Sequence, residues 1–248
     1  MNNRGGIVYR DGYSPERFLE GLKTVDYAIF DLDGTIYPGL FLFDLAKYTF
    51  GRDHEKADKL MRLGFIAKKY KEGKFTEAYK GFVALLKDED PSTLINYSGR
   101  LIGGSYKYAK LTINRLGRDY SIRSLLISIT ADFIGDVARK RFGFDDVMAV
   151  KYRTTMSDGR LKFTGKTWER IDSPQAMKKR MLNRLFGSEG GNFRYVHFFD
   201  SIDDSIVASE AAIRVAVNPN IETYKATGPD IILRGKGDPW KGIYELVK

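Results

Sequence analysis

The 248-residue sequence contains no cysteine, which excludes disulfides, thiolate zinc sites and a cysteine nucleophile. It also lacks any run approaching the roughly 18 apolar residues of a membrane-spanning helix, and its first residues lack the apolar segment of a signal peptide. These absences predict a soluble, cytoplasmic protein that does not span a membrane. Hydrophobic residues make up 43% of the chain, enough for a sizeable core.

The charge balance is basic, with 41 Lys and Arg against 32 Asp and Glu, a net charge of +9. Such a balance favours acidic partners such as phosphates, nucleic acid or lipid headgroups. On its own it describes solubility and encounter, so it names no partner.

Five short apolar runs bounded by turn signals predict buried strands, over residues 25–31, 124–128, 147–150, 195–199 and 213–217. Apolar residues at helical spacing follow the second run, and a second helical pattern over 177–185 follows the start signal Ser173-Pro174. Strands that alternate with helices indicate right-handed crossovers. The sequence therefore predicts an α/β fold, a Rossmann-like doubly wound parallel sheet.

The segment 41–118 shows no strand pattern, and its apolar residues recur at helical spacing. We expect an all-helical, net basic insert at 41–118. The α/β core then comprises residues 1–40 and 119–248.

Two acids, Asp31 and Asp33, come directly after the first predicted strand. In an open parallel sheet, ligands bind outside the carboxyl ends of the strands. Asp31 is a candidate nucleophile on phosphorus, forming an aspartyl-phosphate, and Asp33 could protonate the leaving oxygen and then activate water. A Mg2+ ion would offset the repulsion between the two carboxylates. The alternative is a turn with solvated or helix-capping carboxylates.

A second acidic cluster follows the fourth predicted strand, with Asp200, Asp203 and Asp204. Three acids at the mouth of a sheet favour a bound cation over a solvated loop. Asp200 ends the strand and is the expected direct ligand. Asp204 is expected to support it, with Asp203 as a less favoured substitute.

Ser128, at the end of the second predicted strand, could donate to a phosphoryl oxygen or could cap a helix. A compensating cation is expected from the basic helix that follows Pro174. We select Lys178, on a helical row that faces the sheet, with Lys179 and then Lys166 as substitutes. His197, within a predicted strand, is interpreted as a core histidine rather than a ligand.

The order of these motifs, FDLDGT, Ser128, a lysine near 178 and DSIDD, resembles the haloacid dehalogenase superfamily over nearly the whole chain. The segments LLISITADFIGDVARKRFGFDDVMAV, DGRLKFTGK and AVNPN resemble its phosphoserine phosphatase-like branch, whose members carry a helical cap after the first motif. The resemblance implies that the insert at 41–118 is that cap. It also implies a magnesium-dependent phosphatase of a small phosphomonoester.

The resemblance also implies a role for each motif residue. Asp31 is the nucleophile, and Asp33 is the acid/base, with its backbone carbonyl on the metal. Ser128 and Lys178 bind the phosphoryl group. The implied metal residues are Asp31, Asp33, Asp200 and Asp204.

One position departs from the phosphoserine phosphatase pattern. Leu40 stands where those enzymes have an amine-binding Glu, so we expect anionic or neutral phosphomonoesters to be preferred to O-phosphoserine. The alternative function is a nucleic-acid or polyanion-binding protein of the same fold with little or no catalysis, suggested by the lysines and aromatics interleaved in KKYKEGKF and SYKYAK. The intact acid set favours the phosphatase.

Overall fold

The computed structural model describes residues 3–4, 6–187 and 193–248. In this part of the chain the main sheet has eight strands, and β2 alone runs opposite to the others. β2 pairs antiparallel with β10, and β1 with β2. The order across the sheet is β1 (Asn3–Arg4), β2 (Ile7–Tyr9), β10 (Ile231–Leu233), β9 (Ile213–Val217), β8 (Tyr195–Phe199), β3 (Tyr27–Phe30), β4 (Arg123–Ala131) and β5 (Asp146–Val150).

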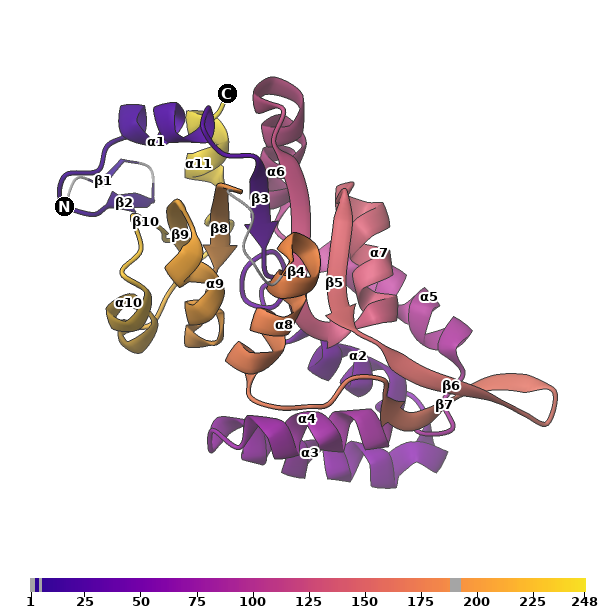
Figure 1. The fold of residues 1–248 in the computed structure, drawn as a ribbon. Helices are drawn as coiled ribbons and strands as arrows, with labels where there is room; N and C mark the ends of the chain where they lie inside the picture. Colours follow the sequence, from indigo (N-terminus) through magenta and orange to yellow (C-terminus); the bar gives the residue numbers. More distant parts are fainter. Residues whose placement is uncertain (1–2, 5, 188–192) are drawn as a thin grey trace.

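Helices cover both faces of this sheet, as the predicted doubly wound fold requires. α8 (Pro174–Phe186) and α9 (Ser205–Glu210) lie in front of it in Figure 1, with α10 (Ile221–Thr227) beside α9. α6 (Lys107–Tyr120) and α7 (Asp132–Phe142) lie behind it, and α11 (Lys241–Leu246) packs against α6. The central strand β8 is therefore buried at every residue, which explains its uninterrupted apolar sequence. α1 (Pro15–Leu22) buries Phe18 and Leu22 in the core.

The segment after β3 is helical, with α2 (Phe41–Phe50), α3 (Ala57–Lys71), α4 (Phe75–Leu85) and α5 (Pro91–Leu101). Figure 1 shows α3 and α4 side by side beyond the carboxyl ends of β3 and β8, with α2 between them and the sheet. α6 extends past residue 118 and packs against β4 and α11. It thus belongs to the packing of the sheet, whereas α2 to α5 lie beyond its edge.

An antiparallel hairpin, β6 (Tyr152–Ser157) and β7 (Arg160–Thr167), was not predicted as strands. Its turn is Asp158-Gly159, and both residues have positive φ, as a two-residue hairpin turn of this type needs. Phe163 is buried, and its backbone exchanges hydrogen bonds with Asp88 and Glu89. The hairpin therefore packs on the helical segment, against α4 and α5.

The five predicted strands are all present, as β3, β4, β5, β8 and β9. β4 is longer than predicted, since it continues past Ser128 to Ala131. Among the described residues, no helix combines the length and apolar content needed to cross a membrane.

Candidate active site

Asp31 follows the last residue of β3, and its backbone N–H donates to the carbonyl of Phe198 in β8 (3.0 Å). The side chain is buried, and its Oδ1 lies 3.2 Å from the Nζ of Lys178. Lys178 comes from α8, whose first turn is capped by the Ser173 side chain. Its ammonium also donates to Oδ1 of Asp204 at 2.6 Å. A buried cation thus bridges two carboxylates from different loops.

Asp33 points away from this ion pair. Its Oδ1 accepts a hydrogen bond of 2.6 Å from the backbone N–H of Phe41, the first residue of α2. The carboxyl is thus held at the junction between the sheet and the helical segment, yet it lines the same cavity as Asp31. A carboxyl in this position can exchange a proton with a group bound beside Asp31.

Gly34 makes room for Asp200. Its φ is +71°, in the region that favours glycine, and a Cβ built there would lie only 2.0 Å from Oδ2 of Asp200. Asp200, which follows β8, can therefore reach the loop after β3 because position 34 has no side chain.

Ser128 is positioned by an irregularity in β4. Between the pairs Ile127–Met148 and Ala131–Val150, β4 has three residues and β5 has one, so the strand bulges at 128–130. Ser128 is almost fully buried, and its Oγ has no hydrogen-bond partner in the described part of the chain. It does not end its strand as predicted, nor does its side chain cap α7, whose N-cap is Ala131. The hydroxyl remains available to a ligand in the cavity.

His197 lies in β8 and is completely buried. Its Nδ1 is 3.2 Å from the carbonyl oxygen of Ile29, to which it can only donate, and its Nε2 is 3.1 Å from Oδ1 of Asp204. The prediction of a core histidine with satisfied nitrogens agrees with these contacts. The sequence did not indicate that this ring also fixes the Asp204 carboxylate.

The carboxyls of the site are strongly perturbed. Burial raises the pKa of Asp31 to about 6, although Lys178 opposes the shift. Burial and the charge of Asp31 raise the pKa of Asp33 to about 7. Burial, Asp31 and Asp204 raise the pKa of Asp200 well above its usual range. Burial would also raise the pKa of Asp204, but Lys178 and His197, which both contact this carboxylate, together hold that pKa below its usual value. Ionising all of these groups together requires a further cation.

Three of the acids fit a hard divalent cation. Asp31, Asp200 and Asp204 each offer an oxygen within 4.8 Å of the others. Oδ2 of Asp204 is buried and has no hydrogen-bond partner among the described residues. Oxygen donors of this kind are those that Mg2+ binds. The side chain of Asp33 is not part of this group, so its predicted metal contact would have to come from the backbone.

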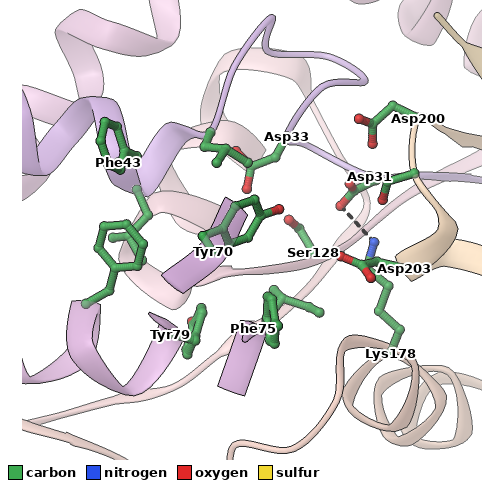
Figure 2. Close-up of a pocket in the computed structure, with 15 residues that line it drawn as sticks. Asp31, Asp33, Phe43, Tyr70, Phe75, Tyr79, Ser128, Lys178, Asp200 and Asp203 are labelled. Atoms are coloured by element: carbon green, nitrogen blue, oxygen red, sulfur yellow. Dashed lines mark ion pairs between the residues drawn. The ribbon is translucent and has the colours of Figure 1, made fainter. Parts of the chain in front are cut away.

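These residues line one side of a cavity of about 90 Å³. The other side comes mainly from the helical segment, with Leu40, Leu42, Phe43, Tyr70, Phe75, Tyr79 and Phe82. In Figure 2 the acids, Ser128 and Lys178 lie opposite the rings of Phe43 and Tyr79. No sequence pattern had indicated this aromatic wall. Tyr70 and Phe75 belong to the KKYKEGKF stretch, whose interleaved lysines and aromatics had suggested nucleic-acid binding.

The other candidate residues lie elsewhere or at the margin. Lys179 pairs with Glu210, and Lys166 is exposed on β7. Asp203 lines the cavity, but it is not part of the three-acid group. Of the three lysines considered, Lys178 is thus the one beside Asp31.

No protein-family model matches the chain, and no curated protein matches it significantly in sequence. Solved structures do match its fold. A protein of unknown function from Bordetella pertussis Tohama I gives a TM-score of 0.70 at 20% identity, over 85% of this chain and 99% of the other. A substrate-bound phosphoserine phosphatase gives a TM-score of 0.66 at 19% identity, over 91% of this chain and 99% of the other. Cytosolic 5′-nucleotidase IIIB bound to cytidine gives a TM-score of 0.66 at 14% identity, over 99% of this chain and 94% of the other.

These similarities show the fold. The chain has a Rossmann-like fold, in the arrangement also found in a phosphoserine phosphatase.

Proposed function

We propose that this protein belongs to the haloacid dehalogenase superfamily, in its phosphoserine phosphatase-like branch. We further propose that it is a magnesium-dependent phosphatase of a small phosphomonoester, acting through an aspartyl-phosphate. The observation that carries the proposal is the convergence of Asp31, Lys178 and the unpartnered Ser128 hydroxyl on one cavity. The presence of a phosphoserine phosphatase and a 5′-nucleotidase among the fold neighbours supports it.

In the first step a carboxylate oxygen of Asp31 attacks phosphorus. A bond forms between this oxygen and phosphorus, and the bond from phosphorus to the leaving oxygen breaks. Asp33 gives the leaving oxygen its proton. The N–H of Phe41 holds one oxygen of Asp33, so the other is free to make this transfer.

In the second step water attacks the phosphorus of the aspartyl-phosphate while Asp33 takes its proton. Phosphate leaves, and the Asp31 carboxylate is restored. Lys178 and the Ser128 hydroxyl would bind the phosphoryl oxygens in both steps. Asp31, Asp200 and the backbone carbonyl of Asp33 would hold a Mg2+ ion, with Asp204 supporting them, and the ion would supply positive charge that offsets the phosphate.

The helical segment 41–118 is proposed as the cap of this site, with α2 to α5 forming the part that covers it. Its residues supply most of the wall that faces Asp31. A cap in this place excludes water and restricts the size of the leaving group.

The nucleic-acid alternative receives less support. Tyr70 and Phe75 of the KKYKEGKF stretch line the cavity, so their rings are not presented to bases on the surface. Lys69 pairs with Glu77 at 2.8 Å, and Lys74 with Glu72 at 2.9 Å. In SYKYAK, both tyrosines pack against the core.

Hydrolysis of p-nitrophenyl phosphate tests the proposal. We expect activity with Mg2+, none after chelation, and recovery when Mg2+ is restored. Asp31→Asn should abolish turnover, whereas Asp26→Asn, at the other end of β3, should not. A gel-shift assay with single-stranded nucleic acid runs in parallel. Full activity of Asp31→Asn, or tight nucleic-acid binding without any hydrolysis, would refute the phosphatase.

A further inference from the structure

The cavity has two chemically different walls. Asp31, Asp33, Ser128 and Lys178 form the wall at the sheet edge, and the helical segment supplies carbon-rich side chains opposite them (Figure 2). A phosphoryl group on Asp31 places the leaving group against this second wall. Its side chains therefore select the leaving group.

The second wall offers no charge. Among the described residues that line the cavity, Lys178 is the one cation, and it belongs to the sheet side. Near the end of α3 and the start of α4, Lys69 pairs with Glu77 and Lys74 with Glu72 at the surface. Leu40 lines the cavity where an amine-binding Glu would have been expected. An ammonium or carboxylate on the leaving group would lose its hydration here without gaining a partner. The basic character of the insert thus gives no reason to favour an anionic leaving group.

The second wall is built mainly from rings that contact one another. Phe75 stacks on Tyr79 with centroids 5.7 Å apart, and Tyr70 is tilted against Phe75 at 6.3 Å. Phe43 meets Phe82 edge to face at 6.0 Å. Packed rings of this kind present fixed faces and edges, which bind another ring by offset stacking or edge contacts.

The polar atoms on this wall are few. The hydroxyl of Tyr79 lies 3.4 Å from that of Tyr152 and is buried with it. Tyr70 points its hydroxyl toward Ser128 in Figure 2, on the side of the phosphoryl group. Little is therefore left on the wall to bind a polyhydroxylated leaving group such as glycerol or a sugar.

We propose that the substrate is a phosphomonoester whose leaving group is an uncharged, single-ring aromatic alcohol, recognised by Phe43, Phe75 and Tyr79. This inference rests on the proposed phosphatase function.

The test compares primary-alcohol phosphates, so that leaving-group chemistry is similar throughout. We expect kcat/KM for benzyl phosphate to exceed that for glycerol 3-phosphate and O-phosphoserine by about 10- to 100-fold, from burial of the ring. Equal values, or a higher value for either comparison substrate, would overturn the inference.

Two variants of Phe75 distinguish recognition by its aromatic ring from recognition by any apolar side chain. Phe75→Ala should lower kcat/KM for benzyl phosphate about 10-fold more than for acetyl phosphate. Phe75→Leu should lose much of the same preference, since it keeps an apolar side chain but removes the ring. The control is Phe65→Ala, on α3, where Phe65 is 70% exposed and outside the cavity. An undiminished preference in Phe75→Leu would overturn the aromatic assignment.

Failure of this inference can be told from failure of the phosphatase proposal. Magnesium-dependent hydrolysis of acetyl phosphate, which has no ring, reports the core chemistry alone. If none of these phosphates is hydrolysed, the phosphatase proposal fails. Calorimetry then compares the affinities of benzylphosphonate and methylphosphonate for the pocket. Tighter binding of benzylphosphonate supports the aromatic pocket, and equal binding overturns it.

Discussion

Replacing Gly34 by alanine should disable the site with little further effect on the fold. The new Cβ would lie 2.0 Å from Oδ2 of Asp200, and real Cβ contacts almost never fall below 3.0 Å. The Asp200 carboxylate must therefore withdraw by about 1 Å, out of its place beside Asp31 and Asp204. Misplacing a catalytic group by about 1 Å can cost about 100-fold in rate. We expect a fall in kcat of at least this order and a higher Mg2+ concentration for half-activation.

The backbone strain at Gly34 is separable from the contact with Asp200. Alanine at φ +71° costs about 1–2 kcal/mol of stability. Gly143, which ends α7, has φ +79° and no atom within 4 Å of a built Cβ. Gly143→Ala should therefore lose similar stability in urea unfolding but keep its kcat and its Mg2+ dependence. If Gly34→Ala retains wild-type kinetics, or if both variants lose activity equally, the reasoning about Asp200 is wrong.

Three further predictions concern other residues. Lys178→Met should lower kcat/KM about 100-fold or more, as loss of a donor to a developing phosphoryl charge does. Lys179→Ala should leave kcat/KM almost unchanged, because Lys179 pairs with Glu210. The reverse result would exchange the roles of the two lysines. His197→Asn should raise the Mg2+ concentration for half-activation about 10- to 100-fold, because the hydrogen bond to Asp204 is lost; an unchanged metal titration would exclude a positioning role. Asp90 caps α5, and hydrogen bonds from Ser92 and Thr93 lower its pKa to about 2. The ionised cap therefore stabilises the fold at pH values above the ordinary pKa of Asp. This stabilisation weakens as the pH falls toward 2 and the carboxylate is protonated. Asp90→Ala should lower the free energy of unfolding by about 1 kcal/mol at pH 7. In urea unfolding, the difference in stability between the variant and the wild type should be smaller at pH 3. A larger difference in acid would contradict the expected direction of the pH dependence.

The sequence was most informative where burial is complete. β8 and β9 have the predicted bounds, 195–199 and 213–217, because a central strand covered on both faces is a continuous apolar run. β10 was missed because it has only three residues. The β6–β7 hairpin was missed because its strands are largely exposed and polar, so they show no apolar run. The long helical segment was predicted because apolar residues recur there at helical spacing.

The two walls of the cavity also differ in how far the sequence predicts them. Asp31 and Asp200 follow neighbouring parallel strands, so sequence order alone indicates that they share one edge of the sheet. The aromatic wall depends on how α2, α3 and α4 lie over that edge, which no local pattern encodes. In the sequence, Tyr70 and Phe75 therefore appeared only as aromatics interleaved with lysines in KKYKEGKF. The contact of His197 with Asp204 likewise depends on the turn after β8, seven residues on.

The central claim is that Asp31 becomes phosphorylated, and trapping the phosphoenzyme tests it most directly. Asp33→Asn should slow hydrolysis of the intermediate, because the residue that takes the proton of the attacking water is lost. The variant is mixed with Mg2+ and p-nitrophenyl phosphate, quenched in acid during turnover and mapped by mass spectrometry. We predict one phosphoryl group on Asp31, absent without Mg2+ and removed by hydroxylamine. A phosphoryl group on another residue, or continuing turnover without any phosphoenzyme, would contradict the account.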